Sequence, residues 1–151
     1  METGLLSVVM TFYNEANIEV DVKRAMSVLE NANIPYEIIL VDDGSKNNSF
    51  NQILDLTLQY DTVVAIGLIR NFGKKHALWA SLDNVNGDCC ICMDSDMPHP
   101  PEYIPEMYKL WKEEHYEVIE GIKKHEQKKI YTETKGRPQY IIRTIIKKFY
   151  H

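Results

Sequence analysis

Short apolar runs alternate with segments of helical periodicity along most of this sequence, and this alternation restricts the folds that the chain can adopt. The apolar runs predict strands at 5–12, 36–43, 62–69, 88–94 and 116–122. Between them, apolar side chains recur every three or four residues, which predicts helices at 14–32, 50–58, 74–85 and 101–115. Strands that alternate with helices form βαβ units. We therefore expect an α/β fold with a mostly parallel, twisted sheet and helices on both faces.

The size and charge of the chain exclude several classes of protein. With 151 residues, 44% of them hydrophobic, the chain is long enough for one domain with its own core. Its net charge of −5 makes a nucleic-acid partner unexpected. The first residues lack the basic region of a signal peptide, and no apolar run reaches the roughly 18 residues that a membrane span needs.

The three cysteines lie together in one predicted strand, at Cys89, Cys90 and Cys92. A zinc site is one interpretation, but this spacing lacks the second ligand pair of such sites. Small buried apolar residues in a reducing compartment are the interpretation that we favour. The sequence thus predicts a cytoplasmic protein, or one at the cytoplasmic face of a membrane.

The last thirty residues differ in composition from the rest. Residues 1–122 are predicted to form the core, and the highly charged segment 123–137 is predicted to be a mobile loop. At 138–151, isoleucines alternate with basic residues in a pattern that predicts an amphipathic helix. This helix is expected to begin a further C-terminal portion, and its apolar face would meet either that portion or a membrane surface.

Polar side chains follow three of the predicted strands. The first strand leads into Tyr13-Asn14-Glu15, the second into Asp42-Asp43-Gly44-Ser45, and the fourth into Asp94-Ser95-Asp96. The carboxyl ends of parallel strands lie at one edge of a sheet, where ligands of such folds bind. Carboxylates gathered there repel one another unless a divalent cation, or hydrogen-bond donors of a ligand, lie among them. Mg²⁺ or Mn²⁺ shared with the phosphates of a nucleotide satisfies this requirement.

Each of these stretches also has a structural interpretation. An acidic pair after a strand can simply cap the next helix, so residues 42–45 do not define a site by themselves. His99 is either a further metal ligand or a packing residue of a proline-rich loop. Arg70 and Lys74 either bind phosphate, with Lys74 at the positive end of a helix, or are solvated charges.

Four stretches in order carry a resemblance to a known family: VVMTFYNE, EIILVDDGSKNNS, IRNFGKKHALWASLDNVNGD and MDSDMPHPPE. Together they resemble the family 2 glycosyltransferases, which have a GT-A fold with a Rossmann-like nucleotide-binding half. The tail at 99–102, His-Pro-Pro-Glu, makes the chain most similar to the polyprenyl-phosphate sugar transferases of the dolichol-phosphate mannosyltransferase type. The likeness covers about residues 5–122, which would be the N-terminal portion of a longer enzyme.

The resemblance implies a role for each site residue. Asp42 and the segment Phe12, Tyr13, Asn14, Glu15 would hold the base and ribose. The same pocket would be shaped by Asp43, Gly44, Ser45, Arg70, Asn71, Gly73 and Lys74. Asp94 and Ser95 would lie near the ribose and diphosphate, and Asp94 and Asp96 would bind the metal. Lys123 and Arg137 would grip the acceptor or the donor phosphate.

The implied reaction is inverting transfer of a sugar from a UDP- or GDP-linked donor to a polyprenyl phosphate, as in the synthesis of cell-envelope glycans. The sequence departs from the family pattern at Thr11, at Pro98, where a glutamine often binds the metal, and at Lys123, where arginine is common. Proline has no side-chain ligand to offer, so a non-catalytic nucleotide-sugar binding module is an alternative. A phosphoacceptor receiver domain is a second alternative, although its acidic pair would follow the first strand.

Overall fold

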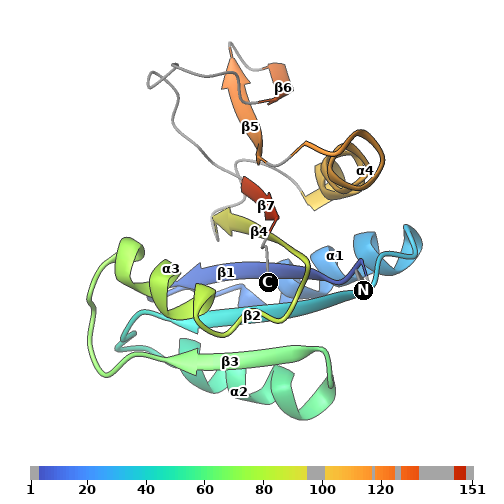
Figure 1. Cartoon of the computed structure of the whole chain (residues 1–151). Coiled ribbons are helices and arrows are strands. Elements are labelled where there is room, and N and C mark those ends of the chain that lie inside the picture. The colour runs from blue at the N-terminus through green and yellow to red at the C-terminus, as the bar shows by residue number, and fades with distance from the viewer. Residues whose placement is uncertain (1–3, 95–100, 117, 125–126, 133–144, 149–151) are drawn as a thin grey trace.

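The computed structural model describes residues 4–94, 101–116, 118–124, 127–132 and 145–148. It has one mixed sheet of seven strands in the order β3-β2-β1-β4-β7-β5-β6 (Figure 1). The strands are β1 (Leu6–Phe12), β2 (Tyr36–Asp42), β3 (Val63–Gly67), β4 (Cys89–Asp94), β5 (Val118–Lys124), β6 (Gln127–Thr132) and β7 (Ile145–Lys148).

The first four strands form the predicted parallel sheet. β1 lies between β2 and β4 and pairs with both in parallel, and β2 pairs in parallel with β3. Strands β7, β5 and β6 extend this sheet in antiparallel pairings, with β7 inserted between β4 and β5. The α/β class and the parallel core are therefore confirmed, and the second half of the sheet is antiparallel.

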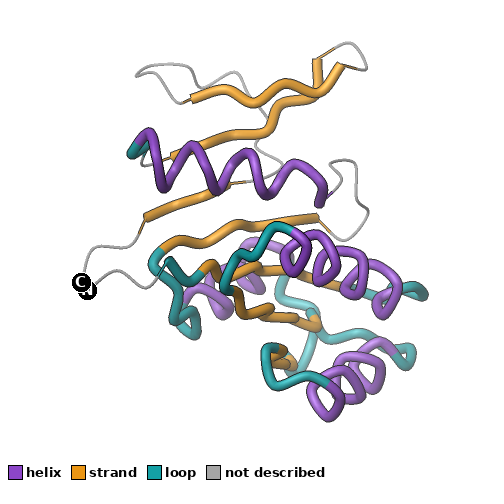
Figure 2. Tube along the Cα trace, turned by 90° about the vertical axis from the view of Figure 1, so that its right-hand side faces the viewer, coloured by secondary structure: helices purple, strands orange, loops and turns teal. Residues whose placement is uncertain are grey.

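Helices cover both faces of the sheet. They are α1 (Ile18–Asn31), α2 (Ser49–Gln59), α3 (Lys74–Leu82) and α4 (Ile104–Glu114), with a short 3₁₀ turn, η1 (Pro101–Tyr103), before α4. α3 lies on one side of the parallel strands and α1 and α2 on the other (Figure 1), and Figure 2 shows the same layers from the side. In the part of the chain that the structure describes, no helix has the length and apolar character needed to cross a membrane.

Burial on both faces explains why the strands read as continuous apolar runs. On β1, Leu6, Val8 and Met10 belong to the core beneath α1, α2 and α4, whereas Val9 belongs to a second core beneath α3. Cys89 and Cys90 take part in these cores as buried thiols, which confirms their prediction as buried small residues. A hydrogen bond with Cys92, together with burial, raises the pKa of the Cys90 thiol.

Two predictions for the C-terminal part are wrong where the structure describes it. β6 lies within the segment 123–137, predicted as a loop, and β5 runs two residues past the predicted boundary at 122. β7 lies within 138–151, predicted as a helix. Pairing with β4 and β5 on either side favours the extended form of Ile145 and Ile146, since β-branched residues suit a strand. The rest of both segments lies outside the described residues.

Candidate nucleotide-binding site

The ends of three parallel strands meet at one edge of the sheet. Phe12, the last residue of β1, is in register with Asp42 of β2. On the other side of β1, Thr11 is in register with Asp94, the last residue of β4. The structure thus brings together the polar segments that follow β1 and β2 with the end of β4, as the sequence predicts for a parallel sheet.

Asp43 joins two of the loops at this edge. Its side chain is buried, and its backbone N–H donates to the carbonyl of Phe12 (2.8 Å). Its two carboxylate oxygens accept hydrogen bonds from the backbone N–H groups of Phe72 (2.9 Å) and Gly73 (3.1 Å). Because both oxygens bind the chain itself, Asp43 fixes the loop between β3 and α3 against the sheet.

Asp42 is buried as well, at 3% exposure, but only half of its carboxylate is satisfied. Oδ2 accepts a hydrogen bond from the backbone N–H of Ser45 (3.0 Å). Oδ1 is buried without a hydrogen-bond partner. Native proteins rarely bury such an acceptor without a partner, because desolvating it costs about 1–3 kcal/mol. This oxygen is therefore the feature of the edge that most directly points to a ligand donor.

Asn14 ties the first loop to the second. Its backbone N–H donates to Ser45 Oγ (2.8 Å), and its side-chain Oδ1 accepts from the N–H of Lys46 (2.9 Å). Asn14 adopts a positive φ of 52°, which asparagine tolerates better than most residues. The helix predicted from residue 14 begins later, because α1 starts at Ile18 after Asn17 and the Asn14 side chain is used between loops.

Gly44 allows the loop after β3 to approach the loop after β2. It has a φ of 69°, and a Cβ at this position would overlap the backbone of Arg70 and Asn71. The Arg70 guanidinium in turn lies over the ring of Phe72, with Cζ 4.5 Å from the ring centroid. Gly44, Arg70 and Asn71 are thus brought to the same edge as the aspartates.

A pocket of about 140 Å³ opens at this edge. Its lining residues are Thr11, Phe12, Tyr13, Glu15, Asp43 and Lys74. Lys74 is the first residue of α3, where the helix dipole adds to its positive charge and favours an anion. The pocket therefore joins an aromatic segment, suited to a base or sugar, with a cationic helix end, suited to phosphate.

Not every predicted site residue can be placed. Ser95, Asp96, His99 and Arg137 lie outside the described residues. Asp94 and Lys123 are placed by their backbone alone, at the end of β4 and within β5. Among the residues that the structure describes, no three His, Cys, Asp or Glu side chains form a metal-binding group. The predicted metal site is therefore neither confirmed nor contradicted.

Two residues of this edge were missed from the sequence. Thr11 lines the pocket, although the sequence drew attention to it only as a departure from the family pattern. The buried Ser49 donates its hydroxyl to the carbonyl of Glu15 (3.0 Å) and so supports the first loop. Thr11 could have been found by aligning β1 with β4 in parallel, because this alignment pairs Thr11 with Asp94. No sequence pattern marks Ser49.

The fold is that of an α/β protein with a pocket at the carboxyl edge of its parallel strands, and comparison with known proteins identifies the family. The profile of glycosyl transferase family 2 matches residues 7–150. This match covers nearly the whole chain. The chain belongs to glycosyl transferase family 2.

Curated relatives are similar over their N-terminal parts. An undecaprenyl-phosphate 4-deoxy-4-formamido-L-arabinose transferase of Yersinia enterocolitica is 34% identical over 134 residues, which are 87% of this chain and 41% of the relative. An uncharacterized glycosyltransferase of Synechocystis is 37% identical over 123 residues, 81% of this chain and 38% of the relative. The chain thus spans about two fifths of the length of these relatives.

Solved structures show the same GT-A fold. A mannosyltransferase of Pyrobaculum calidifontis, solved with GDP-Man and Mn²⁺, superposes with a TM-score of 0.66 at 18% identity, over 79% of this chain and 35% of that one. Glucosyl-3-phosphoglycerate synthase of Mycobacterium tuberculosis, solved with UDP, gives a TM-score of 0.56 at 26% identity, over 77% of this chain and 43% of that one. The predicted GT-A architecture is confirmed.

Proposed function

We propose that this chain is the donor-binding part of an inverting glycosyltransferase that transfers a sugar from a nucleotide-diphosphate sugar to a polyprenyl phosphate. Family membership supports the class of reaction, and the names of the curated relatives support the acceptor. The observation that carries the proposal is the buried Oδ1 of Asp42, which has no hydrogen-bond partner. Asp42 does not itself line the pocket, but it directly precedes Asp43, which does. A ring N–H of a base or a ribose hydroxyl would supply the missing donor.

The described side chains suit the parts of such a donor. Tyr13, at 41% exposure, offers aromatic surface to the base, whereas the Phe12 ring is buried in the core. Glu15 lines the pocket, where its carboxylate would accept hydrogen bonds from sugar hydroxyls. Lys74, at the start of α3, is positioned to neutralise a phosphate. Asp43 keeps this wall of the pocket in place through its two hydrogen bonds to the loop after β3.

A divalent cation fits the donor set that the sequence provides. Asp94 lies at the same edge as Asp42, one strand beyond β1, and Asp96 follows it by two residues. We assign Asp94 and Asp96 as ligands of Mg²⁺ or Mn²⁺, because hard cations prefer carboxylate oxygens. When bound, such an ion stabilises the negative charge that develops on the leaving diphosphate.

The acceptor side of the reaction needs little acid–base help from the protein. A lipid phosphate is already ionised near neutral pH, so its oxygen can attack the sugar without a strong general base. Lys123 of β5 and Arg137 are assigned to hold the acceptor or donor phosphate. Transfer to a lipid requires the enzyme to meet a membrane surface, and the free thiols of Cys89, Cys90 and Cys92 support the cytoplasmic, reducing side.

Donor binding is the direct test. We expect UDP or GDP, with Mn²⁺, to raise the melting temperature, because a ligand at 100 times its dissociation constant stabilises a protein by about 2.7 kcal/mol. Asp42→Asn should weaken this binding by about tenfold, since an amide loses one acceptor and gains a donor. Asp61→Asn, at an exposed position away from the pocket, is the matched control.

Three outcomes would contradict parts of the proposal. The absence of a shift with UDP, GDP, CDP and dTDP would remove the donor site. Equal binding by Asp42→Asn and the native chain would remove the role of Oδ1. In the full-length protein, donor binding without transfer to a polyprenyl phosphate would leave a binding module, as the proline at position 98 suggests.

A further inference from the structure

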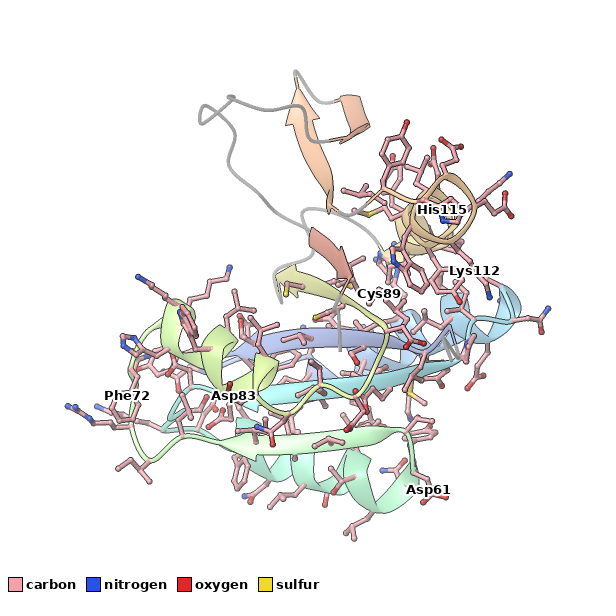
Figure 3. The ribbon with its side chains drawn as sticks, in the orientation of Figure 1. Asp61, Phe72, Asp83, Cys89, Lys112 and His115 are labelled. Carbon is pink, nitrogen blue, oxygen red and sulfur yellow. The ribbon has the colours of Figure 1, made fainter. Side chains whose placement is uncertain are left out.

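The loop between β3 and α3 and the outer side of α3 expose large apolar side chains. Ile69 is 94% exposed, Trp79 is 62% exposed, and Phe72 lies between them in the sequence, also exposed. Figure 3 shows Phe72 on the loop that leads into α3, at the outer edge of the molecule. Exposed apolar residues scattered singly need no explanation, but a contiguous set does.

Contacts join three residues of this region, and helical spacing places two more side by side. The Arg70 guanidinium lies over Phe72, and the ring centroids of Phe72 and His76 are 6.4 Å apart. On α3, Lys75 and Trp79 are four residues apart, so they lie on the same side of the helix. We name this set the basic-aromatic surface; it comprises Ile69, Arg70, Phe72, Lys75, His76 and Trp79.

The charge of this surface is opposite to that of the whole chain. The chain carries a net charge of −5, yet residues 62–82 contain Arg70, Lys74 and Lys75 and no aspartate or glutamate. The exposed Asp83 follows at the C-cap of α3, one turn after Trp79, and offsets part of this positive charge. The carboxylate of Asp43 lies close behind the loop, but it is buried and accepts two backbone hydrogen bonds. The exposed cations therefore lie on the same surface as the exposed side chains of Trp79, Phe72 and Ile69.

We propose that the basic-aromatic surface docks on an anionic lipid bilayer. Tryptophan and other amphipathic rings favour the membrane interface, and lysine and arginine are attracted to anionic head groups. Ile69 and Phe72 add apolar area that can enter the boundary between the head groups and the acyl chains. Apolar burial and electrostatic attraction, each weak alone, therefore add together. A second copy of the chain fits this surface less well, because two copies would face each other with like charges. Nucleic acid would leave the exposed Ile69 without a partner.

This inference goes beyond the proposed function, because it concerns a surface outside the donor pocket. Lys74 lines that pocket and directly precedes Lys75, so docking would bring the pocket to the lipid head groups. The test below uses neither nucleotide nor sugar. Its failure is therefore distinct from a failure of donor binding.

Vesicle binding tests the proposal with the whole chain. We expect the chain to co-sediment with vesicles of phosphatidylglycerol and phosphatidylcholine, not with phosphatidylcholine alone, and to be released by salt. The chain has two tryptophans, and Trp111 is buried. A shift of emission to shorter wavelength on vesicle addition would thus report Trp79 entering the interface. Lys75→Glu and Trp79→Ser should each weaken binding by about fivefold or more.

Matched variants elsewhere control for general effects. Leu58→Ser removes a side chain that is 85% exposed on α2, and Lys109→Glu reverses an exposed charge on α4. Both should bind vesicles like the native chain, and thermal melts should show that all four variants fold. The proposal is overturned if anionic vesicles bind no better than neutral ones, or if Lys75→Glu and Trp79→Ser bind like the controls. It is also overturned if these two variants instead change the oligomeric state in size-exclusion chromatography.

Discussion

The two faces of the parallel sheet are built very differently. Beneath α1, α2 and α4 lies a large core of fully buried side chains, from Leu6 to Ile119. Beneath α3, the buried hydrophobic cluster of the described residues comprises Val9, Ile39, Val41, Ala77 and Cys90, and the apolar side chains packed against it are only partly covered. The first face holds the fold together, whereas the helix on the second face contributes Lys74 to the pocket and carries part of the basic-aromatic surface. The comparison suggests that this fold places its stability and its binding surfaces on opposite sides.

Alanine substitutions at two neighbouring residues of β2 test this difference between the faces most directly. Ile38 and Ile39 are both completely buried, but they belong to different cores. Ile38→Ala should cost about 4–5 kcal/mol, because the large core cannot collapse around the cavity. Ile39→Ala should cost about 2–3 kcal/mol, because half-exposed neighbours can move in. Urea unfolding measures both, and an equal or reversed order would remove the distinction between the faces.

A smaller effect is expected where the α3 side meets the sheet edge. Gly44→Ala should destabilise the chain by at least about 2 kcal/mol, because φ is positive and the new Cβ would overlap the backbone of the loop after β3. Gly73→Ala is the comparison: a Cβ would meet open space there, so its cost comes from the backbone alone. Its φ of 96° and ψ of 156° lie in a region that is essentially restricted to glycine, which costs about 1–3 kcal/mol. Thermal melts compare the two, and similar losses would show that Gly44 is needed only for its φ.

The smallest effect is expected for the ion pair between α1 and η1. The guanidinium of Arg24 donates two hydrogen bonds of 2.9 Å to Glu102. Both side chains are about half exposed, at 47% and 52%, so the pair is well screened. Arg24→Ala should therefore cost less than about 1 kcal/mol in urea unfolding. A loss as large as that of Ile39→Ala would show that stability on this side depends on more than its core.

The sequence predicted the parallel half of the fold well because its strands are buried on both faces and its helices are periodic. It also predicted that Asp42, Asp43 and the segment after β1 would meet, which follows from parallel pairing alone. It did not predict β6 and β7, since short strands of alternating charge and isoleucine depend on their partners rather than on local pattern. Nor did it reveal which oxygen of Asp42 stays unpaired, because that depends on how the loops pack.

The position of β7 has a consequence for how the chain folds during its synthesis. β7 is synthesised after the other strands that the structure describes, yet it lies between β4 and β5, which precede it. Without it, those two strands would be left about two strand spacings apart, roughly 10 Å, and neither could complete its ladder. During translation the parallel quartet can assemble first, whereas the antiparallel trio must wait for residues near 145–148 to leave the ribosome. The strand that joins the parallel and antiparallel halves of the sheet is thus made after the strands on both sides of it.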